Sequence, residues 1–174
     1  LILEKENSLG GTWRDNTYLG AACDVPSTLY SYSFELDETN WHSDYSSQSD
    51  ILDYINTIAD KYHIQKYLKC NQQVERLEYL VHEGRWKIEC KNGIVFLAKF
   101  VITAVGQLHH PKIPTLKGAD IFLGDILHTA RFTKNHDSKY FQGKNVAVIG
   151  SGASSVQLVP QLQKLCKNVN LFHR

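Results

Sequence analysis

Residues 144–174 read KNVAVIGSGASSVQLVPQLQKLCKNVNLFHR, and this stretch decides the fold. The apolar run 145–149 predicts a strand, which the glycine turn 150–152 follows directly. The pattern then predicts a helix from about residue 153 to residue 164 and a second strand over 169–172. This order is half of a βαβ unit with its crossover, so we predict the start of a parallel α/β domain.

The turn from Gly150 to Ser155 matches G-x-G-x-x-[small] in the strand-to-helix context that gives this motif meaning. Gly150 permits the tight turn, and Gly152 lets a pyrophosphate approach the backbone. The small Ser155 lets the helix pack on the strand, and the helix N-terminus offers N–H groups to a phosphate. The motif therefore predicts a dinucleotide site; the alternative is a tight turn that binds no ligand.

The end of the second strand bears on the choice of nucleotide. NAD-binding units place an acidic residue there, roughly 20 residues after the turn, to hold the ribose 2′-hydroxyl. This sequence has His173 and Arg174 instead. Because a guanidinium suits a 2′-phosphate, Arg174 favours NADP over NAD; the alternative is a solvated charge at the strand end.

The N-terminal part predicts a second, partial dinucleotide-binding lobe. Residues 1–4 form a strand that ends in an acid, as in a unit whose glycine turn precedes residue 1. The apolar residues of 49–63 recur at helical spacing behind a capping box at 47–50.

Three β-type runs, 74–80, 85–90 and 94–105, predict a small antiparallel meander that ends in a buried strand. Residues 106–141 predict an irregular connector. The expected fold is α/β, with two partial Rossmann-like lobes and the meander in the first lobe. We expect a partial dinucleotide-binding domain at 1–110, whose first glycine-rich turn lies upstream, a connector at 111–143 and the start of an NADPH-binding domain at 144–174.

Bulk properties exclude several classes of protein. The net charge of +1 is scattered over 174 residues, so neither nucleic acid nor an anionic membrane is an expected partner. Four cysteines without a C-x-x-C pair give no zinc or disulfide signature and indicate a reducing, cytoplasmic compartment. No run is long and apolar enough for a membrane span. The chain has no Met and both ends resemble strands, so we expect an internal fragment of a longer protein.

Two further segments resemble the class B flavoprotein monooxygenases, and within them the Baeyer–Villiger branch. Residues 122–132, FLGDILHTARF, are similar to the fingerprint F-x-G-x-x-x-H-T-x-x-W that joins the two lobes. The other segment resembles the family's flavin-contacting loop through Gly10-Gly11-Thr12-Trp13, Asn16, Tyr18, Gly20, Cys23-Asp24, Pro26-Ser27 and Tyr30.

The resemblance implies a role for each matching residue. His128 acts at the lobe junction as a structural or gating residue, and Asp24 orients an arginine that lies beyond residue 174. The domain at 1–110 is then a partial FAD-binding domain, and FAD is contacted by Glu4, Gly11, Thr12, Trp13, Asp15, Asp24, Tyr30 and Val74. NADP(H) is contacted by Gly150, Ser151, Gly152, Ala153, Ser154, Ser155, Gln157 and Arg174.

The implied activity is that of an FAD-dependent, NADPH-using monooxygenase. It transfers one oxygen atom from O2 to a small organic substrate through a peroxyflavin, converting a ketone to an ester or lactone. Phe132 departs from the pattern because Trp is expected there, and Thr133 and Leu19 depart as well. The terminal aromatic is closer to the N- and S-oxygenating flavin monooxygenases, which stay the first alternative.

Two rivals belong to other classes. A flavoprotein disulfide reductase would need a redox cysteine pair, which the sequence lacks. A nucleotide-binding fragment or degenerate homologue without activity stays open.

We predict that residues 1–174 alone hold FAD poorly, because half of the cradle for the adenosine diphosphate is expected upstream. The absorption spectrum of the purified polypeptide tests this. A yellow preparation with flavin near one per chain would contradict it.

Overall fold

The computed structural model describes residues 1–36 and 41–173. Its contacts divide the chain into two compact units. Unit 1 consists of Leu1–Gly10 and Ile55–His109, and unit 2 of Gly11–Tyr54 and His110–Arg174. This division follows contacts within the chain, whereas the predicted domains follow cofactors, so the domain limits stay a prediction.

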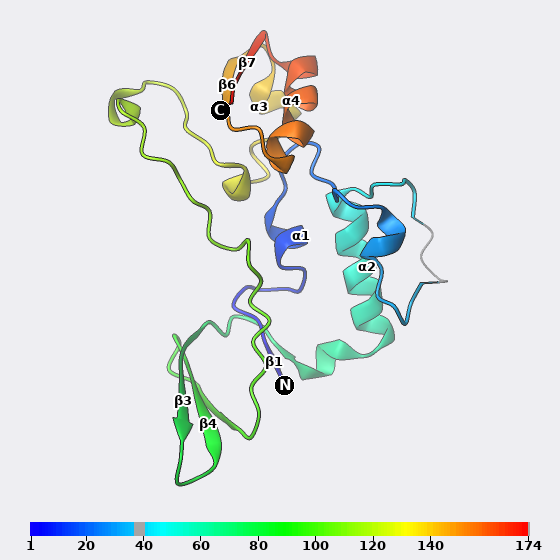
Figure 1. The fold of residues 1–174 in the computed structure, drawn as a ribbon, viewed down its shortest axis with the longest axis vertical. Helices are drawn as coiled ribbons and strands as arrows, with labels where there is room; N and C mark the ends of the chain where they lie inside the picture. Colours follow the sequence, from blue (N-terminus) through cyan, green and yellow to red (C-terminus); the bar gives the residue numbers. More distant parts are fainter. Residues whose placement is uncertain (37–40, 174) are drawn as a thin grey trace. The chain divides into compact units, whose positions relative to one another are not determined.

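Unit 1 contains two small sheets. Strand β1 (Ile2–Leu3) pairs in parallel with β2 (Leu68–Lys69). Strands β3 (Val74–Leu80), β4 (Arg85–Cys90) and β5 (Val95–Ala98) form an antiparallel sheet in that order, with β3 and β4 side by side in Figure 1. The predicted meander is therefore confirmed, whereas the sequence did not reveal β2.

The third run of the meander is shorter than predicted. We expected a buried strand over 94–105, but β5 ends at Ala98. The ladder explains this, since Ala98 pairs with Trp86 and β4 begins only one residue earlier. Residues 99–105 have passed the end of their partner strand, and Ile102 is 91 % exposed. The prediction of a long buried strand was wrong.

Helix α2 (Gln48–Lys61) confirms the helix predicted over 49–63. Its N-terminus carries the expected reciprocal cap: the Ser47 backbone N–H donates to Asp50 Oδ2 at 3.3 Å, and the Asp50 N–H donates to Ser47 Oγ at 3.2 Å. His63 lies just past its end, with a φ of 53° in the left-handed region. A 3-10 turn follows at Ile64–Tyr67.

Unit 2 contains the predicted strand, turn, helix and strand. Strand β6 (Asn145–Ile149) lies parallel to β7 (Asn168–Phe172), with helix α4 (Ala153–Leu165) between them in the chain (Figure 1). The α/β fold class is thus confirmed. The remaining short elements of this unit are α1 (Thr12–Asp15), α3 (Ser138–Phe141) and 3-10 turns at Ser27–Tyr30, Ala119–Ile121 and Thr129–Arg131.

Four buried side chains form the core of unit 2: Phe132, Phe141, Leu158 and Leu162. Leu158 and Leu162 are one helical turn apart, so they form one apolar face of α4. Phe132 and Phe141 stack at 5.7 Å between ring centroids. The flavin-side segment is the stretch 10–30 that resembles the flavin-contacting loop. The residues that pack around the core come from this segment, α3, β6, α4 with its C-cap, and β7: Tyr18, Leu19, Tyr140, Val146, Val148, Leu165, Cys166 and Val169. Across the described residues, no helix is long and apolar enough to cross a membrane.

Candidate functional site

The glycine turn leaves the space beside α4 open. Gly150 has a φ of 114°, in the region that favours glycine, and its N–H donates to the Phe172 carbonyl at 2.8 Å. A Cβ built at Gly150 or Gly152 would meet no atom within 4 Å. The turn therefore has room for a ligand beside its backbone, as a pyrophosphate requires.

Ser155 lies one turn into α4 and is 8 % exposed. Its small side chain is buried, in keeping with the predicted close packing of helix and strand. Within the described residues, its hydroxyl is the buried side-chain polar atom that lacks a hydrogen-bond partner. Such an atom costs roughly 1–3 kcal/mol when nothing bonds to it, so its presence fits a site that takes a polar group.

Gln157, which the family resemblance assigns to NADP(H), bonds to residues 18 and 22 in this structure. Its Oε1 accepts from the Tyr18 hydroxyl at 2.6 Å, and its Nε2 donates to the Ala22 carbonyl at 2.8 Å. The predicted nicotinamide-side helix is thereby bonded to the predicted flavin-side segment within unit 2.

The flavin-side segment brings Trp13 and Tyr30 together. The Trp13 indole N–H donates to the Tyr30 hydroxyl at 2.7 Å, and the rings meet edge to face at 5.3 Å between centroids. The Trp13 carbonyl accepts from the Gln48 side chain, which fixes α1 to the start of α2. Two aromatic residues predicted to contact FAD therefore form one aromatic pair, in which Trp13 is half-buried and Tyr30 is exposed.

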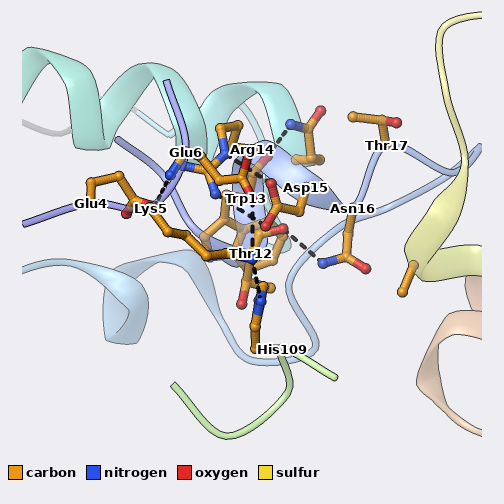
Figure 2. A network of polar contacts seen from close by, with 12 residues as sticks. Glu4, Lys5, Glu6, Thr12, Trp13, Arg14, Asp15, Asn16, Thr17 and His109 are labelled. Carbon is orange, nitrogen blue, oxygen red and sulfur yellow. Dashed lines mark hydrogen bonds and ion pairs between the residues drawn. The ribbon is translucent and has the colours of Figure 1, made fainter. Parts of the chain in front are cut away.

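The short helix α1 is held by its own side chains. Figure 2 shows the Arg14 guanidinium turned toward the Asp15 carboxylate, with Nε to Oδ1 at 2.8 Å and Nη2 to Oδ2 at 3.1 Å. This two-point pairing fixes both groups more firmly than a single contact. The Asn16 amide closes the helix by donating to the Thr12 carbonyl at 2.9 Å. Asp15, a predicted FAD residue, is thus engaged by Arg14.

Asp24 is exposed between two buried anchors. Cys23 is 4 % exposed and its N–H donates to the Ser46 carbonyl at 3.0 Å, while Ser27 is 2 % exposed and bonds to Ser46. A fixed backbone therefore presents the Asp24 side chain at the surface of unit 2.

Unit 1 contains Glu4 and Val74, two of the residues predicted to contact FAD. The Glu4 N–H donates to the Lys69 carbonyl at 3.0 Å, and the Gln72 N–H donates to the Glu4 carbonyl at 2.9 Å. The chain reaches Val74 two residues later. The Glu4 carboxylate accepts from the Glu6 N–H at 2.9 Å, so its side chain folds over the residues that follow β1.

Next to Glu4, the Lys5 amine contacts the His109 ring (Figure 2). This contact gives His109 a role in packing the end of unit 1. Over the described parts of the chain, no group of three possible metal ligands forms. The four cysteines are free thiols.

His128 caps the turn that precedes Phe132. Its Nδ1 accepts from the Ala130 N–H at 3.2 Å, and its carbonyl accepts from the Arg131 N–H at 2.7 Å. The turn directs Phe132, which is 8 % exposed, into the core against Phe141. His128 therefore shapes the fingerprint locally.

Sequence reasoning missed a second contact of the fingerprint. The Tyr140 hydroxyl donates to Asp125, and this bond raises the pKa of Tyr140. Lys144 lies over the Tyr140 ring at 3.4 Å and 3.8 Å from the Asp125 carboxylate. A charged residue at a variable motif position gives no local signal of such partners.

Arg174, predicted to hold the 2′-phosphate, lies outside the described residues.

These features match known proteins over the length of the chain. The family described as pyridine nucleotide-disulphide oxidoreductase matches residues 25–174. The chain belongs to this family. Its separated cysteines set it apart from members that would use a redox pair.

The relatives are monooxygenases. A Baeyer–Villiger monooxygenase of Streptomyces coelicolor is 40 % identical over the whole chain, which covers 33 % of that protein. The FAD-binding monooxygenase ktnD of Aspergillus niger is 36 % identical, again over the whole chain and 30 % of the relative. The chain thus spans about a third of the length of the curated relatives it matches.

Solved structures agree with these relatives. A caprolactone-bound cyclohexanone monooxygenase matches with a TM-score of 0.91 and 33 % identity, over 99 % of this chain and 34 % of that one. An NADP-bound steroid monooxygenase matches with a TM-score of 0.90 and 35 % identity, over 99 % and 33 % of the two chains. The predicted resemblance to Baeyer–Villiger monooxygenases is confirmed.

We predict that Gly20→Ala destabilises unit 2. Gly20 has a φ of 79°, and a Cβ there would lie 2.7 Å from the Gln157 carbonyl oxygen. Gly143→Ala is the matched control, since Gly143 has a φ of 70° and open space around its Cβ position. Both variants carry the left-handed strain of about 1 kcal/mol, and Gly20→Ala adds a further loss of about 1–3 kcal/mol from the clash. Urea unfolding of both variants measures the difference, and equal losses would contradict the contact.

Proposed function

We propose that the whole protein is an FAD-dependent, NADPH-using monooxygenase of the Baeyer–Villiger type. The observation that carries this proposal lies in unit 2, where the flavin-side segment and the fingerprint both pack on α4, the helix that begins directly after the glycine turn. A cofactor pair that exchanges a hydride needs its two sites fixed to one support. The names of the relatives support the same class of reaction.

The residues present fit both cofactors. On the NADPH side, the open backbone at Gly150 and Gly152 and the unpartnered hydroxyl of Ser155 suit a phosphate at the start of a helix. On the FAD side, the paired rings of Trp13 and Tyr30 offer a flavin an aromatic surface with polar groups at its edge. When bound, the flavin supplies the redox chemistry that couples NADPH oxidation to oxygen transfer.

The protein's own residues then have three tasks. Asp24 presents a fixed carboxylate to an arginine, which would hold positive charge beside the reacting centre. Glu4 and Val74 hold the adenosine end of FAD. His128 keeps the fingerprint turn in shape. A small organic substrate and O2 are the proposed partners, and a cytoplasmic location stays a prediction.

The second candidate is N- or S-oxygenation. Phe132 favours it, because the Baeyer–Villiger pattern has Trp at this position; the Phe132 ring stacks on Phe141 and lies tilted against His136. The two reactions differ in the substrate that accepts oxygen: a ketone carbonyl in the first, an amine or sulfide in the second.

The full-length protein, mixed with NADPH and O2, tests the proposal against three substrates. We expect a cyclic ketone to give a lactone with NADPH consumed in equal amount, measured by gas chromatography beside the loss of absorbance of NADPH. Products formed only from a tertiary amine or a sulfide would move the assignment to the second candidate. Absence of NADPH oxidation would contradict both candidate functions.

We also propose that Arg174 holds the 2′-phosphate of NADPH. Arg174→Gln removes a charge-assisted contact worth about 1.5–3 kcal/mol, so the KM for NADPH should rise about 10- to 100-fold. The KM for NADH should stay unchanged, because NADH has no such phosphate. Steady-state kinetics with both nucleotides measure this, and Lys167→Gln, at an exposed lysine of the same unit, is the control. A loss that is equal for both nucleotides would contradict the assignment.

A further inference from the structure

We propose that Gln157 is a positioning residue that couples the flavin-side segment to helix α4, in place of the NADP(H) contact that the family resemblance implies. The inference rests on the proposed function. Gln157 lies about 7–8 Å along the helix from Gly152 at 1.5 Å per residue. The first turn of α4, and not Gln157, is therefore the part beside the glycine turn.

The side chain of Gln157 uses both ends of its amide on one segment. Oε1 accepts from the Tyr18 hydroxyl at 2.6 Å and from the Ala22 N–H at 3.4 Å. Nε2 donates to the Ala22 carbonyl at 2.8 Å. Together they hold Ala22 by its own donor and its own acceptor, a pattern that a primary amide matches and a carboxylate does not.

Backbone contact reinforces the amide. Gly20 approaches so closely that a Cβ would lie 2.7 Å from the Gln157 carbonyl and 2.9 Å from Gln161 Cγ. The Ala21 N–H closes a turn by donating to the Tyr18 carbonyl at 3.1 Å. Residues 18–22 thus form a turn packed on one face of α4.

The position of this turn explains what the contact does. α1, with Trp13 and Asp15, ends three residues before Tyr18, and Asp24 follows Ala22 by two. The glycine turn lies at the N-terminal end of α4, before Gln157. Gln157 therefore fixes the distance between the flavin-side residues and the nicotinamide-side turn, and misplacement by about 1 Å is enough to slow a hydride transfer.

The test uses the full-length protein loaded with FAD and a double-mutant cycle of Gln157→Leu and Tyr18→Phe. Gln163→Leu, an exposed glutamine of the same helix, is the matched control. Stopped-flow absorbance under anaerobic conditions measures flavin reduction by NADPH, and fluorescence titration measures the Kd of NADP. Hydrogen exchange over residues 18–22 is measured in the protein without nucleotide.

We expect Gln157→Leu to slow flavin reduction about tenfold, the effect of losing a hydrogen bond that sets geometry. The Kd of NADP should change less than twofold, and exchange over residues 18–22 should become faster. Tyr18→Phe should act in the same direction, and the double variant should be no slower than Gln157→Leu. Gln163→Leu should match the wild type in all three measurements.

Two outcomes overturn the inference. A tenfold weaker Kd for NADP in Gln157→Leu, with Tyr18→Phe unchanged, would make Gln157 a direct ligand of the nucleotide. Unchanged hydrogen exchange over residues 18–22 in Gln157→Leu would show that Gln157 does not hold this turn on α4. If the wild type shows no flavin reduction by NADPH, the proposed function fails instead, while the exchange measurement still decides whether Gln157 holds this turn. Should Gln157→Leu not fold, Tyr18→Phe carries the same comparison.

Discussion

The apolar face of α4 is the constraint on which unit 2 depends. Leu158 and Leu162 are 4 % and 1 % exposed, and Phe132 and Phe141 pack against them. Burial of each such side chain contributes roughly 1.5–3 kcal/mol. Since the strands, the fingerprint and the flavin-side segment all meet this face, the same packing that stabilises the unit also holds these segments together.

The fingerprint gains a physical meaning from this core. Its last aromatic residue, Phe132, is buried in the core, and His128 caps the turn that precedes it. The Asp125 bond to Tyr140 fastens the middle of the motif to α3. Thr17 adds a weak bond to the Phe132 carbonyl at 3.4 Å. In this structure the fingerprint therefore joins the flavin-side segment, α3 and α4.

Local signals were predictable from the sequence, and non-local ones were not. The cap of α2 and the order of β6, α4 and β7 follow from residues close together in the chain, and the structure has both. The two-residue strand β2 pairs with β1 across more than sixty residues, which no local pattern reveals. The run after Ala98 is apolar enough for a strand, but its pairing depends on where β4 begins.

Gln157 shows the same division within one motif. Helix periodicity puts Gln157 and Gln161 on a common face, both against Gly20, while Ser155, Leu158 and Leu162 occupy the buried face. The sequence could separate these two faces, yet it could not say what covers the first one, because Tyr18 and Ala22 are 135 residues or more away. Glycine at position 20 was the available sign of a close approach, since a Cβ there would lie 2.7 Å from the Gln157 carbonyl oxygen, closer than a side chain can be accommodated.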